Sequence, residues 1–409
     1  MRLSTYVLSI ACTFSFLVGC APELVPPDGD ILGTVLGVAA ETADAPEVPS
    51  HSGPEGEGSA VASEKLSVTG SLEGSGNYEL YELGSSAAGD LWSVSGADVF
   101  SPPAPMVAVL FDADYNLLMR RVVTASSPLE HVMRDASSRV YLGVTPPNGG
   151  NGGAFRYAVR RTGGHAIPAD RQQTVWLNFG PGSQIKVHRR SGISFAAFEG
   201  VMLGEDYEGH SETIKQAIVQ AMQEDYASYD LVILSSDDGP PPDGPHSTLH
   251  FGSSDPGLLG LADNVDNYNQ DETQNAIIFI ETFARFDVMR LEPEEMGQMV
   301  GNVASHELGH LLGLYHTLDP DDIMDTTGTA WDLAEDQLFL HTELDPTVFP
   351  VGQENSPVLL AQTIGLRPGV AVLDPSPHTA KMARRAMIRR FAGEQIRCMC
   401  GTCQHLDDH

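Results

Sequence analysis

Apolar and polar residues alternate in short runs between residues 65 and 166. The runs are 66–72, 78–80, 91–94, 106–111, 140–144 and 155–159. Turn signals such as Gly-Ser-Gly-Asn and Pro-Asn-Gly-Gly separate them. An apolar position every second residue is typical of strands with one buried face. Several short strands at this spacing predict a β-sandwich domain over residues 65–166.

The pattern changes after residue 171, where strand-like and helical periods mix. Strands are predicted at 175–179, 231–234, 248–251, 258–262 and 276–280. Three helices are predicted, at 212–226, from residue 294 onward, and at 331–339. Ser211 is the expected cap of the first. The chain therefore reads as a multi-domain protein, an all-β sandwich followed by an α+β domain over residues 171–370.

The first 64 residues carry targeting and linker patterns. Met1 and Arg2 precede an apolar run at 6–18, which is too short to span a membrane and predicts a signal peptide over residues 1–19. The run ends in Leu-Val-Gly-Cys, which resembles a bacterial lipobox with Cys20 as the lipid-bearing residue. Plain cleavage near Gly19 or Ala21, releasing a soluble protein, is the alternative. Residues 20–64 contain no Lys or Arg and predict a disordered acidic tether.

Charge narrows the classes of partner. The chain has 23 Lys and Arg against 55 Asp and Glu, a formal net charge of −32. Such acidity argues against nucleic acid and anionic membrane surfaces as partners. We expect a cell-envelope protein, an outer-membrane lipoprotein facing outside or a secreted one, that is monomeric and meets the membrane only through a lipid on Cys20.

The segment 305–316, Ser-His-Glu-Leu-Gly-His-Leu-Leu-Gly-Leu-Tyr-His, carries the candidate chemistry. His306 and His310 are four residues apart and share one helix face. Gly313 lets the backbone leave the helix, so that His316 can return to the same point. Three neutral imidazoles leave a fourth zinc position open, as in catalytic sites. Glu307 is then placed as a general base and not as a ligand.

This pattern, His-Glu-x-x-His-x-x-Gly-x-x-His followed by Met324, resembles the metzincin metallopeptidases. Thr317 after the third histidine is most similar to the matrixin branch. The resemblance implies one catalytic zinc on His306, His310 and His316, catalysis by Glu307 and a protein or peptide substrate. It also implies an apolar floor at Met324 and a cleft strand, for which 258–262 is the candidate. Residues 65–166 contain, in this order, Asp-Leu-Trp at 90–92, Val-Leu-Phe-Asp at 109–112, Tyr-Leu-Gly-Val at 141–144 and Tyr-Ala-Val at 157–159. This order resembles the bacterial pre-peptidase C-terminal domain, usually an accessory module.

Further metal sites are weaker hypotheses. Acidic and amide residues after the cleft strand are calcium candidates, namely Asp263, Asp266, Asn267, Asp271 and Glu272. A second zinc at His246 and His250 is an alternative. The tail, residues 371–409, combines a predicted basic helix with Cys398, Cys400, Cys403, His405 and His409. It allows a disulfide, a small metal site or a thiolate that keeps the zinc latent.

The sequence therefore predicts a secreted, lipid-anchored zinc metalloendopeptidase. Two other functions stay open. One is a non-catalytic surface lipoprotein, for adhesion or as a scaffold, in which zinc only stabilises the fold. The other is a peptidase that processes mainly its own linker or tail.

Overall fold

The structure, a computed structural model, describes residues 35–37, 63–74, 76–96, 105–124, 126–147 and 152–370. The predicted signal, the lipid-bearing Cys20 and the tail at 371–409 lie outside this range. Within the predicted tether, β1 (Val35–Gly37) pairs in parallel with the strand that contains Leu80, so these three residues are not structureless. None of the described helices combines the length and apolar character needed to cross a membrane.

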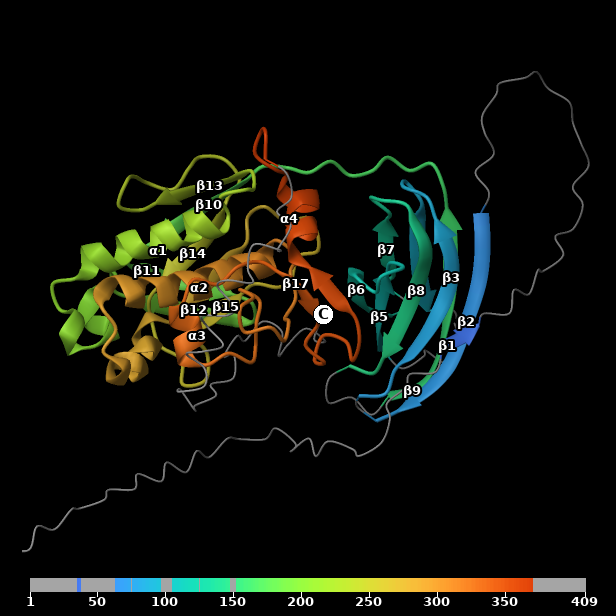
Figure 1. Cartoon of the computed structure of the whole chain (residues 1–409), viewed down its shortest axis with the longest axis horizontal. Coiled ribbons are helices and arrows are strands. Elements are labelled where there is room, and N and C mark those ends of the chain that lie inside the picture. Colours follow the sequence, from blue (N-terminus) through green and yellow to red (C-terminus); the bar gives the residue numbers. More distant parts are fainter. Residues whose placement is uncertain are drawn as a thin grey trace, which may run out of the picture. The chain divides into compact units, whose positions relative to one another are not determined.

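The first part is built only of strands, which confirms the all-β prediction (Figure 1). One sheet has the order β1-β3-β8-β5-β6 and the other β2-β9-β4-β7. The strands are β2 (Ser63–Glu73), β3 (Glu79–Ser86), β4 (Leu91–Gly96), β5 (Met106–Phe111), β6 (Leu117–Val123), β7 (Leu129–Val132), β8 (Ser137–Thr145) and β9 (Gly152–Thr162). The sequence pattern missed β6 and β7, because the adjacent Arg120 and Arg121 and the short length of β7 obscure their alternation.

Buried side chains of both sheets fill the space between them. Trp92 and Tyr157 are the largest, and each is at most 1% exposed. Strand β5 differs from the others because all six of its residues are buried. Met106, Ala108 and Leu110 belong to the sandwich core, whereas Val107, Val109 and Phe111 belong to a second cluster on the opposite face. Both faces of this strand are therefore covered.

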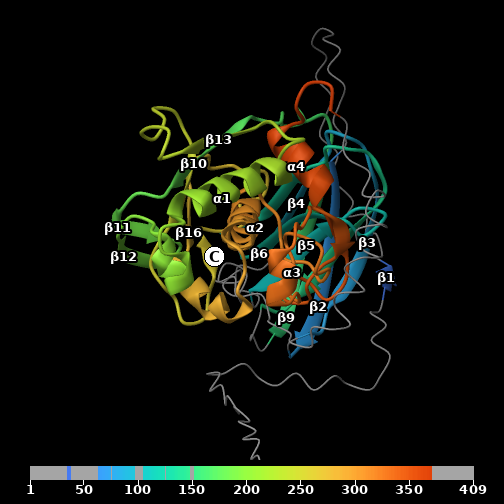
Figure 2. The ribbon, with the colours of Figure 1, turned by 60° about the vertical axis from the view of Figure 1, so that its left-hand side comes forward.

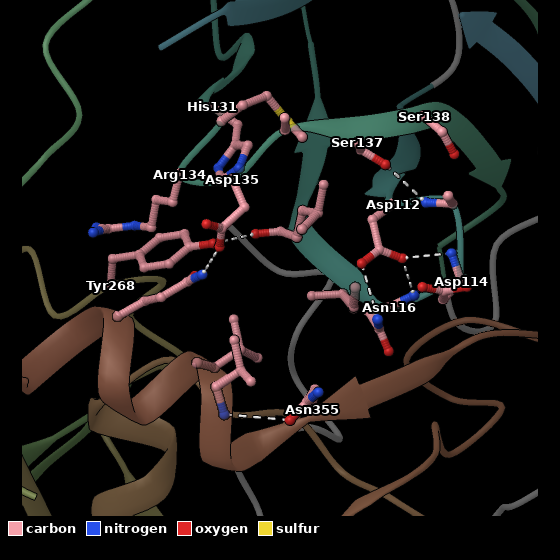
Figure 3. A pocket seen from close by; sticks show the side chains of 18 residues that line it. Asp112, Asp114, Asn116, His131, Arg134, Asp135, Ser137, Ser138, Tyr268 and Asn355 are labelled. Atoms are coloured by element: carbon pink, nitrogen blue, oxygen red, sulfur yellow. Dashed lines mark hydrogen bonds between the residues drawn. The ribbon is translucent and has the colours of Figure 1, made fainter. Parts of the chain in front are cut away.

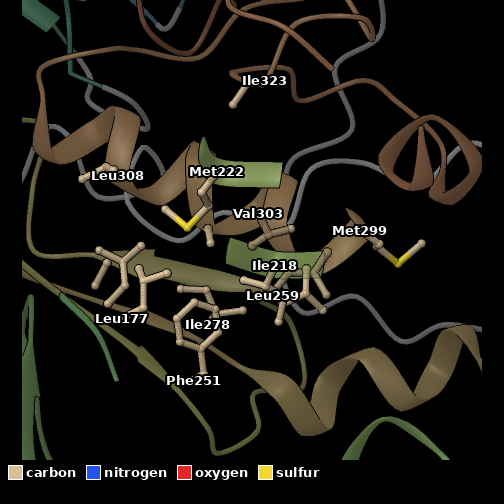
Figure 4. Packing of buried hydrophobic residues seen from close by; sticks show 14 of the residues in the cluster. Leu177, Ile218, Met222, Phe251, Leu259, Ile278, Met299, Val303, Leu308 and Ile323 are labelled. Carbon is tan, nitrogen blue, oxygen red and sulfur yellow. The ribbon is translucent and has the colours of Figure 1, made fainter. Parts of the chain in front are cut away.

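The second part holds a mixed five-stranded sheet of order β13-β10-β14-β16-β15 and confirms the α+β prediction. Its strands are β10 (Gln173–Asn178), β13 (Leu231–Ser235), β14 (Ser247–Phe251), β15 (Gly260–Ala262) and β16 (Asn275–Ile278). Only β15 runs antiparallel, and it ends the sheet. Helices α1 (Ser211–Asp225) and α2 (Pro293–Leu311) pack in one apolar cluster with this sheet (Figures 2 and 4).

A hairpin of β11 (Gly182–Val187) and β12 (Arg190–Phe195) packs in a separate cluster with Leu258, Leu261, Ile277 and Phe279. The sequence reading missed this hairpin. The remaining described elements are η1 (Gly200–Leu203), η2 (Glu205–Tyr207), η3 (Ile280–Met289), α3 (Ala330–Ala334), β17 (His341–Glu343), β18 (Gln353–Asn355) and α4 (Ser356–Ile364).

Two helix predictions need correction. Ser211 is the first residue of α1 and not its cap; its hydroxyl accepts the Gly200 N–H and donates to Glu199. The helix expected over 331–339 is only α3, because Glu335 leaves the helical region with ψ 159°. Trp331 lies in this short helix and is 44% exposed. With five residues, α3 is too short for its sequence pattern to define a buried face.

The outer face of β5 is covered by the segment that precedes β18. Phe349, 1% exposed, packs edge-on against Phe111 at 5.4 Å and Tyr78 at 5.6 Å between ring centroids. A Cβ on Gly143 would come within 2.6 Å of the Phe349 ring, so this position needs glycine. Arg120 Nε donates to the Val348 carbonyl at 3.0 Å. The sandwich and the α+β part therefore share a core.

Phe349→Ala tests the shared core. We expect the free energy of unfolding to fall by about 3–5 kcal/mol, because the variant loses apolar burial and leaves a cavity. Denaturant titration measures it, with Val288→Ala, at an 86% exposed position, as the control that changes little. A loss below about 1 kcal/mol would contradict the shared core.

Candidate metal centre

Helix α2 carries the first two histidines into the core. Glu292 and Glu295 form a capping box at its start, and Pro293 occupies the first turn, where no backbone N–H is needed. The helix ends beyond His310, and Gly313 takes φ 98°. A Cβ there would lie 2.9 Å from the Asp266 carbonyl oxygen, so both conformation and space require glycine. The predicted bend is therefore present.

The structure brings His306, His310 and His316 together. Their candidate ligand atoms all lie within 4.8 Å of one another, and the Nε2 atoms of His306 and His316 are 3.2 Å apart. None of the three residues is more than 5% exposed. This is the only cluster of three or more metal-binding side chains among the described residues.

The hydrogen bonds of the triad fix its chemistry. The Nδ1–H of His306 donates to the Ile323 carbonyl at 2.7 Å, and that of His310 to the Leu314 carbonyl at 2.8 Å. In a neutral ring the Nε2 lone pair is then available as a ligand. Burial lowers the pKa of His306 to about 4 and the pKa values of His310 and His316 well below their usual range. Neutral, buried rings with converging lone pairs fit a zinc ion.

The segment around Met324 closes the floor of the site. Met324 is fully buried, and a Cβ on Gly309 would lie 2.6 Å from its sulfur, so the glycine between the histidines makes room for it. Thr317 donates its hydroxyl to Asp322 Oδ2 at 2.9 Å and its N–H to the Met324 carbonyl at 2.9 Å. Burial raises the pKa of Asp322 to about 8. Gly309 and Asp322 are supporting residues that the sequence reading missed.

Glu307 projects from α2 beside the triad and is fully buried. Strand β15 passes directly over it, since a Cβ on Gly260 would lie 2.8 Å from the Glu307 carboxyl carbon. Gly260 therefore lets the edge of the sheet approach the candidate base. This contact places the predicted cleft strand next to Glu307, although the strand is shorter than the expected 258–262.

A buried carboxyl group fixes the backbone of Tyr315, the residue that precedes His316. Both carboxyl oxygens of Glu354, which is fully buried, accept the N–H of Tyr315, at 2.9 and 3.0 Å. Burial raises the pKa of Glu354 well above its usual range. The Tyr315 hydroxyl contacts Asn267, and its ring lies 6.0 Å from the Arg120 guanidinium carbon. No spacing rule pointed to Glu354, because it lies 38 residues beyond His316.

The acidic loop after β15 is organised by its own hydrogen bonds. Asp263 accepts the His188 and Asn275 N–H groups, and Asp266 accepts the Asp271 N–H and the Gln274 side-chain amide. These contacts give the carboxylates a structural role, and calcium binding by this loop stays a prediction.

The second zinc at His246 and His250 is not supported. His250 instead lies 3.2 Å from the side chains of both Asn178 and Asn275.

A cavity of about 320 Å³ lies between the β5–β6 turn, β7 and α4, away from the histidine triad (Figure 3). Asp112 holds the turn by accepting the Asp114 and Asn116 N–H groups at 2.9 Å. On the other side, Arg134 stacks over Tyr268 at 4.2 Å. His131 is 4% exposed and stacks on the same tyrosine. Burial, followed by the charge of Arg134, lowers the pKa of His131 to about 4.

Glu354→Ala tests the support of His316. The variant leaves the Tyr315 N–H without its acceptor, and we expect zinc affinity to fall about 10- to 100-fold. Glu354→Gln keeps an acceptor oxygen and should bind zinc nearly as tightly as the unaltered protein. Competition with a chromophoric chelator measures both, and equal affinity of the Ala and Gln variants would refute the support.

His131 predicts a pH dependence of stability. Its folded pKa lies below its usual 6.5, so between pH 6.5 and about 4 the unfolded chain binds the proton that the folded chain excludes. The free energy of unfolding should therefore fall on acidification, and His131→Phe should remove about 2–3 kcal/mol of that fall. Urea titrations across this range measure the slope, and identical slopes for both proteins would disprove it.

Comparisons with known proteins agree with this site. The family model "Matrixin" matches residues 210–339, which include the triad and Met324. None of the curated proteins compared matches the chain. Among solved structures, the pre-peptidase C-terminal domain of Bacillus anthracis collagenase is 18% identical, with 23% of this chain and 88% of that chain covered at TM-score 0.17.

The periplasmic lysozyme inhibitor PliG of Aeromonas hydrophila is 10% identical, and the match covers 31% of this chain and 96% of that chain at TM-score 0.21. At such TM-scores neither likeness carries an argument. The family match stands apart from them, because it falls on the segment whose histidines converge in the fold. Residues 210–339 carry a domain of the matrixin family of zinc metallopeptidases.

Proposed function

We propose that the chain is a zinc-dependent endopeptidase that binds its substrate as an extended strand along β15. The observation that carries the proposal is the buried convergence of His306, His310 and His316 beside Glu307. Strand β15 ends the sheet in the described part of the chain and passes over Glu307 at Gly260, which makes it the candidate to pair with a substrate backbone.

The protein's own groups have separable tasks in hydrolysis. Bound zinc supplies Lewis acidity, which makes water more acidic and polarises a carbonyl group. The three imidazoles would hold that ion. Burial keeps the rings neutral, and the Ile323 and Leu314 carbonyls orient His306 and His310. Glu307 takes the proton of the attacking water and later passes it to the leaving amine. No covalent bond to the protein forms.

Several finer points belong to the same proposal. The lipid on Cys20, the outer-membrane or secreted location and the monomeric state are supported only by the sequence pattern. A scaffold protein with a stabilising zinc explains the triad equally well, but it gives no reason for a carboxylate beside the metal site with a glycine opposite it. A self-processing peptidase uses the same site and differs only in substrate.

Glu307→Ala tests the function. We expect the variant to keep its zinc and to lose turnover by at least about 10²- to 10⁴-fold, because the proton transfer loses its base. The assay incubates the full chain with zinc and a diverse peptide library and identifies cleavage by mass spectrometry. Glu294→Ala, an exposed glutamate on the same helix, is the matched control.

The outcomes separate the three functions. Cleavage that a chelator abolishes and the Glu307 variant lacks supports the peptidase. Turnover retained by the variant would contradict the role of Glu307 as the base. A wild-type chain that binds zinc but cleaves no peptide would favour the scaffold protein. Intact mass over time would reveal self-processing as a shortened chain without cleavage of added peptides.

A further inference from the structure

One loop joins the metal centre to the sandwich. It comprises residues 263–274, between β15 and β16, and is called here the Tyr268 loop. None of its residues takes part in the proposed hydrolysis. Its tyrosine, Tyr268, packs against both the apolar cluster of the α+β part and the core of the sandwich. The loop is therefore in a position to connect the two.

On one side the Tyr268 loop contacts the segment that carries the histidines. The Asp266 N–H donates to the carbonyl of His310 at 3.0 Å. Asn267 Nδ2 donates to the hydroxyl of Tyr315, next to the third histidine, at 3.0 Å. The loop backbone also leaves no room for a side chain at Gly313, where the chain turns back toward the site. The loop thus supports the turn between the second and third histidines.

On the other side the sandwich holds the tyrosine. The Tyr268 hydroxyl donates to the Leu118 carbonyl at 3.1 Å. The His131 ring stacks on the tyrosine with 5.6 Å between centroids, and the Arg134 guanidinium carbon lies 4.2 Å from its ring centroid (Figure 3). The cavity of about 320 Å³ borders the same side chain. Its position therefore depends on these few contacts and not on close packing on every side.

The loop backbone is held in a conformation that it would not adopt alone. Tyr268 takes φ 62° and Asn269 φ 47°. Such left-handed conformations are unfavourable for a bulky residue and persist where surrounding contacts impose them. The Asn269 side-chain amide donates to Gln173 Oε1 at 2.9 Å, and its N–H to the Asp266 carbonyl at 2.8 Å. A tyrosine without its anchor would leave this conformation, and Asp266 lies only two residues away.

We propose that Tyr268 is a positioning residue of the metal centre. It anchors the loop in the sandwich, so that Asp266 and Asn267 hold the turn that places His310 and the third histidine. The tyrosine acts through these two residues and is not a ligand. This inference rests on the zinc site of the proposed function, but not on peptide cleavage.

Tyr268→Asn tests the anchor in the full chain. Asparagine tolerates the left-handed conformation, so the variant removes the ring and keeps the backbone preference. We expect the zinc dissociation constant, measured by competition with a chromophoric chelator, to rise about tenfold. Tyr268→Phe keeps the ring and both ring contacts, and its dissociation constant should stay within about threefold of that of the unaltered protein.

Cobalt separates positioning from a general loss of stability. The positions of the visible absorption bands of the cobalt-loaded chain report the geometry of the ligands, whereas a smaller folded fraction lowers only their intensity. Tyr268→Asn should shift the bands, and Tyr268→Phe should restore them. Leu66→Asn is the matched control, because Leu66 is a half-buried side chain that packs against the same sandwich core from β2. It should leave the bands and the zinc affinity unchanged.

A variant on the sandwich side tests the same anchor independently. Arg134→Ala removes the guanidinium from the tyrosine ring and should raise the zinc dissociation constant about two- to threefold. Combined with Tyr268→Asn it should add nothing further, since both changes act on one contact. If the Tyr268→Asn chain does not fold, Arg134→Ala decides by the same two measurements.

Unchanged zinc affinity and cobalt bands in Tyr268→Asn would overturn the inference alone. So would an equal shift of the bands in Leu66→Asn, because the effect would then follow from the stability of the sandwich. A wild-type chain that binds no zinc would overturn the metal site and this inference with it. A wild-type chain that binds zinc but cleaves no peptide would contradict the peptidase function and leave the role of Tyr268 to these measurements.

Discussion

The burial of three neutral imidazoles is the constraint on which the site depends. The candidate ligand atoms of the three rings lie within 4.8 Å of one another, and the rings are buried away from water. Such a cluster favours a bound cation over a proton, because burial lowers the pKa values of all three rings. The glycines at 309 and 313 follow from the same requirement: one admits Met324 beneath the rings, and the other turns the chain back toward them.

Local patterns predicted the residues that a short segment can bring together. His306 and His310 converge through the helix period, and His316 through the turn at Gly313, so eleven residues were enough to predict the triad. Glu354 and Gly260 could not be found this way. Each contacts the site through a tertiary approach from another element, with no periodicity that relates it to the histidines. The fold class and the family were confirmed, whereas the catalytic and ligand roles stay predictions.

The apolar run at 106–111 indicates more than the strand with one buried face that was predicted for it. The run Met-Val-Ala-Val-Leu-Phe of β5 has no polar member, which is typical of a strand covered on both faces. A sandwich with one solvated face would alternate there. The structure accounts for the run, because Phe349 and Val348 cover the face that turns away from the sandwich core. By contrast, Trp331 shows that a lone aromatic residue in a short helix does not establish burial.

The shared core changes what the sandwich does. Tyr315 belongs to the same apolar cluster as Val107, Val109 and Phe111 of β5, and it directly precedes His316. Its N–H is held by Glu354, from a segment whose Gln353 N–H donates to the Tyr115 carbonyl of the sandwich at 2.9 Å. The sandwich therefore packs against the residue that precedes the third histidine, and a chain cut between the two parts would expose the apolar face of β5 and remove its packing on Tyr315.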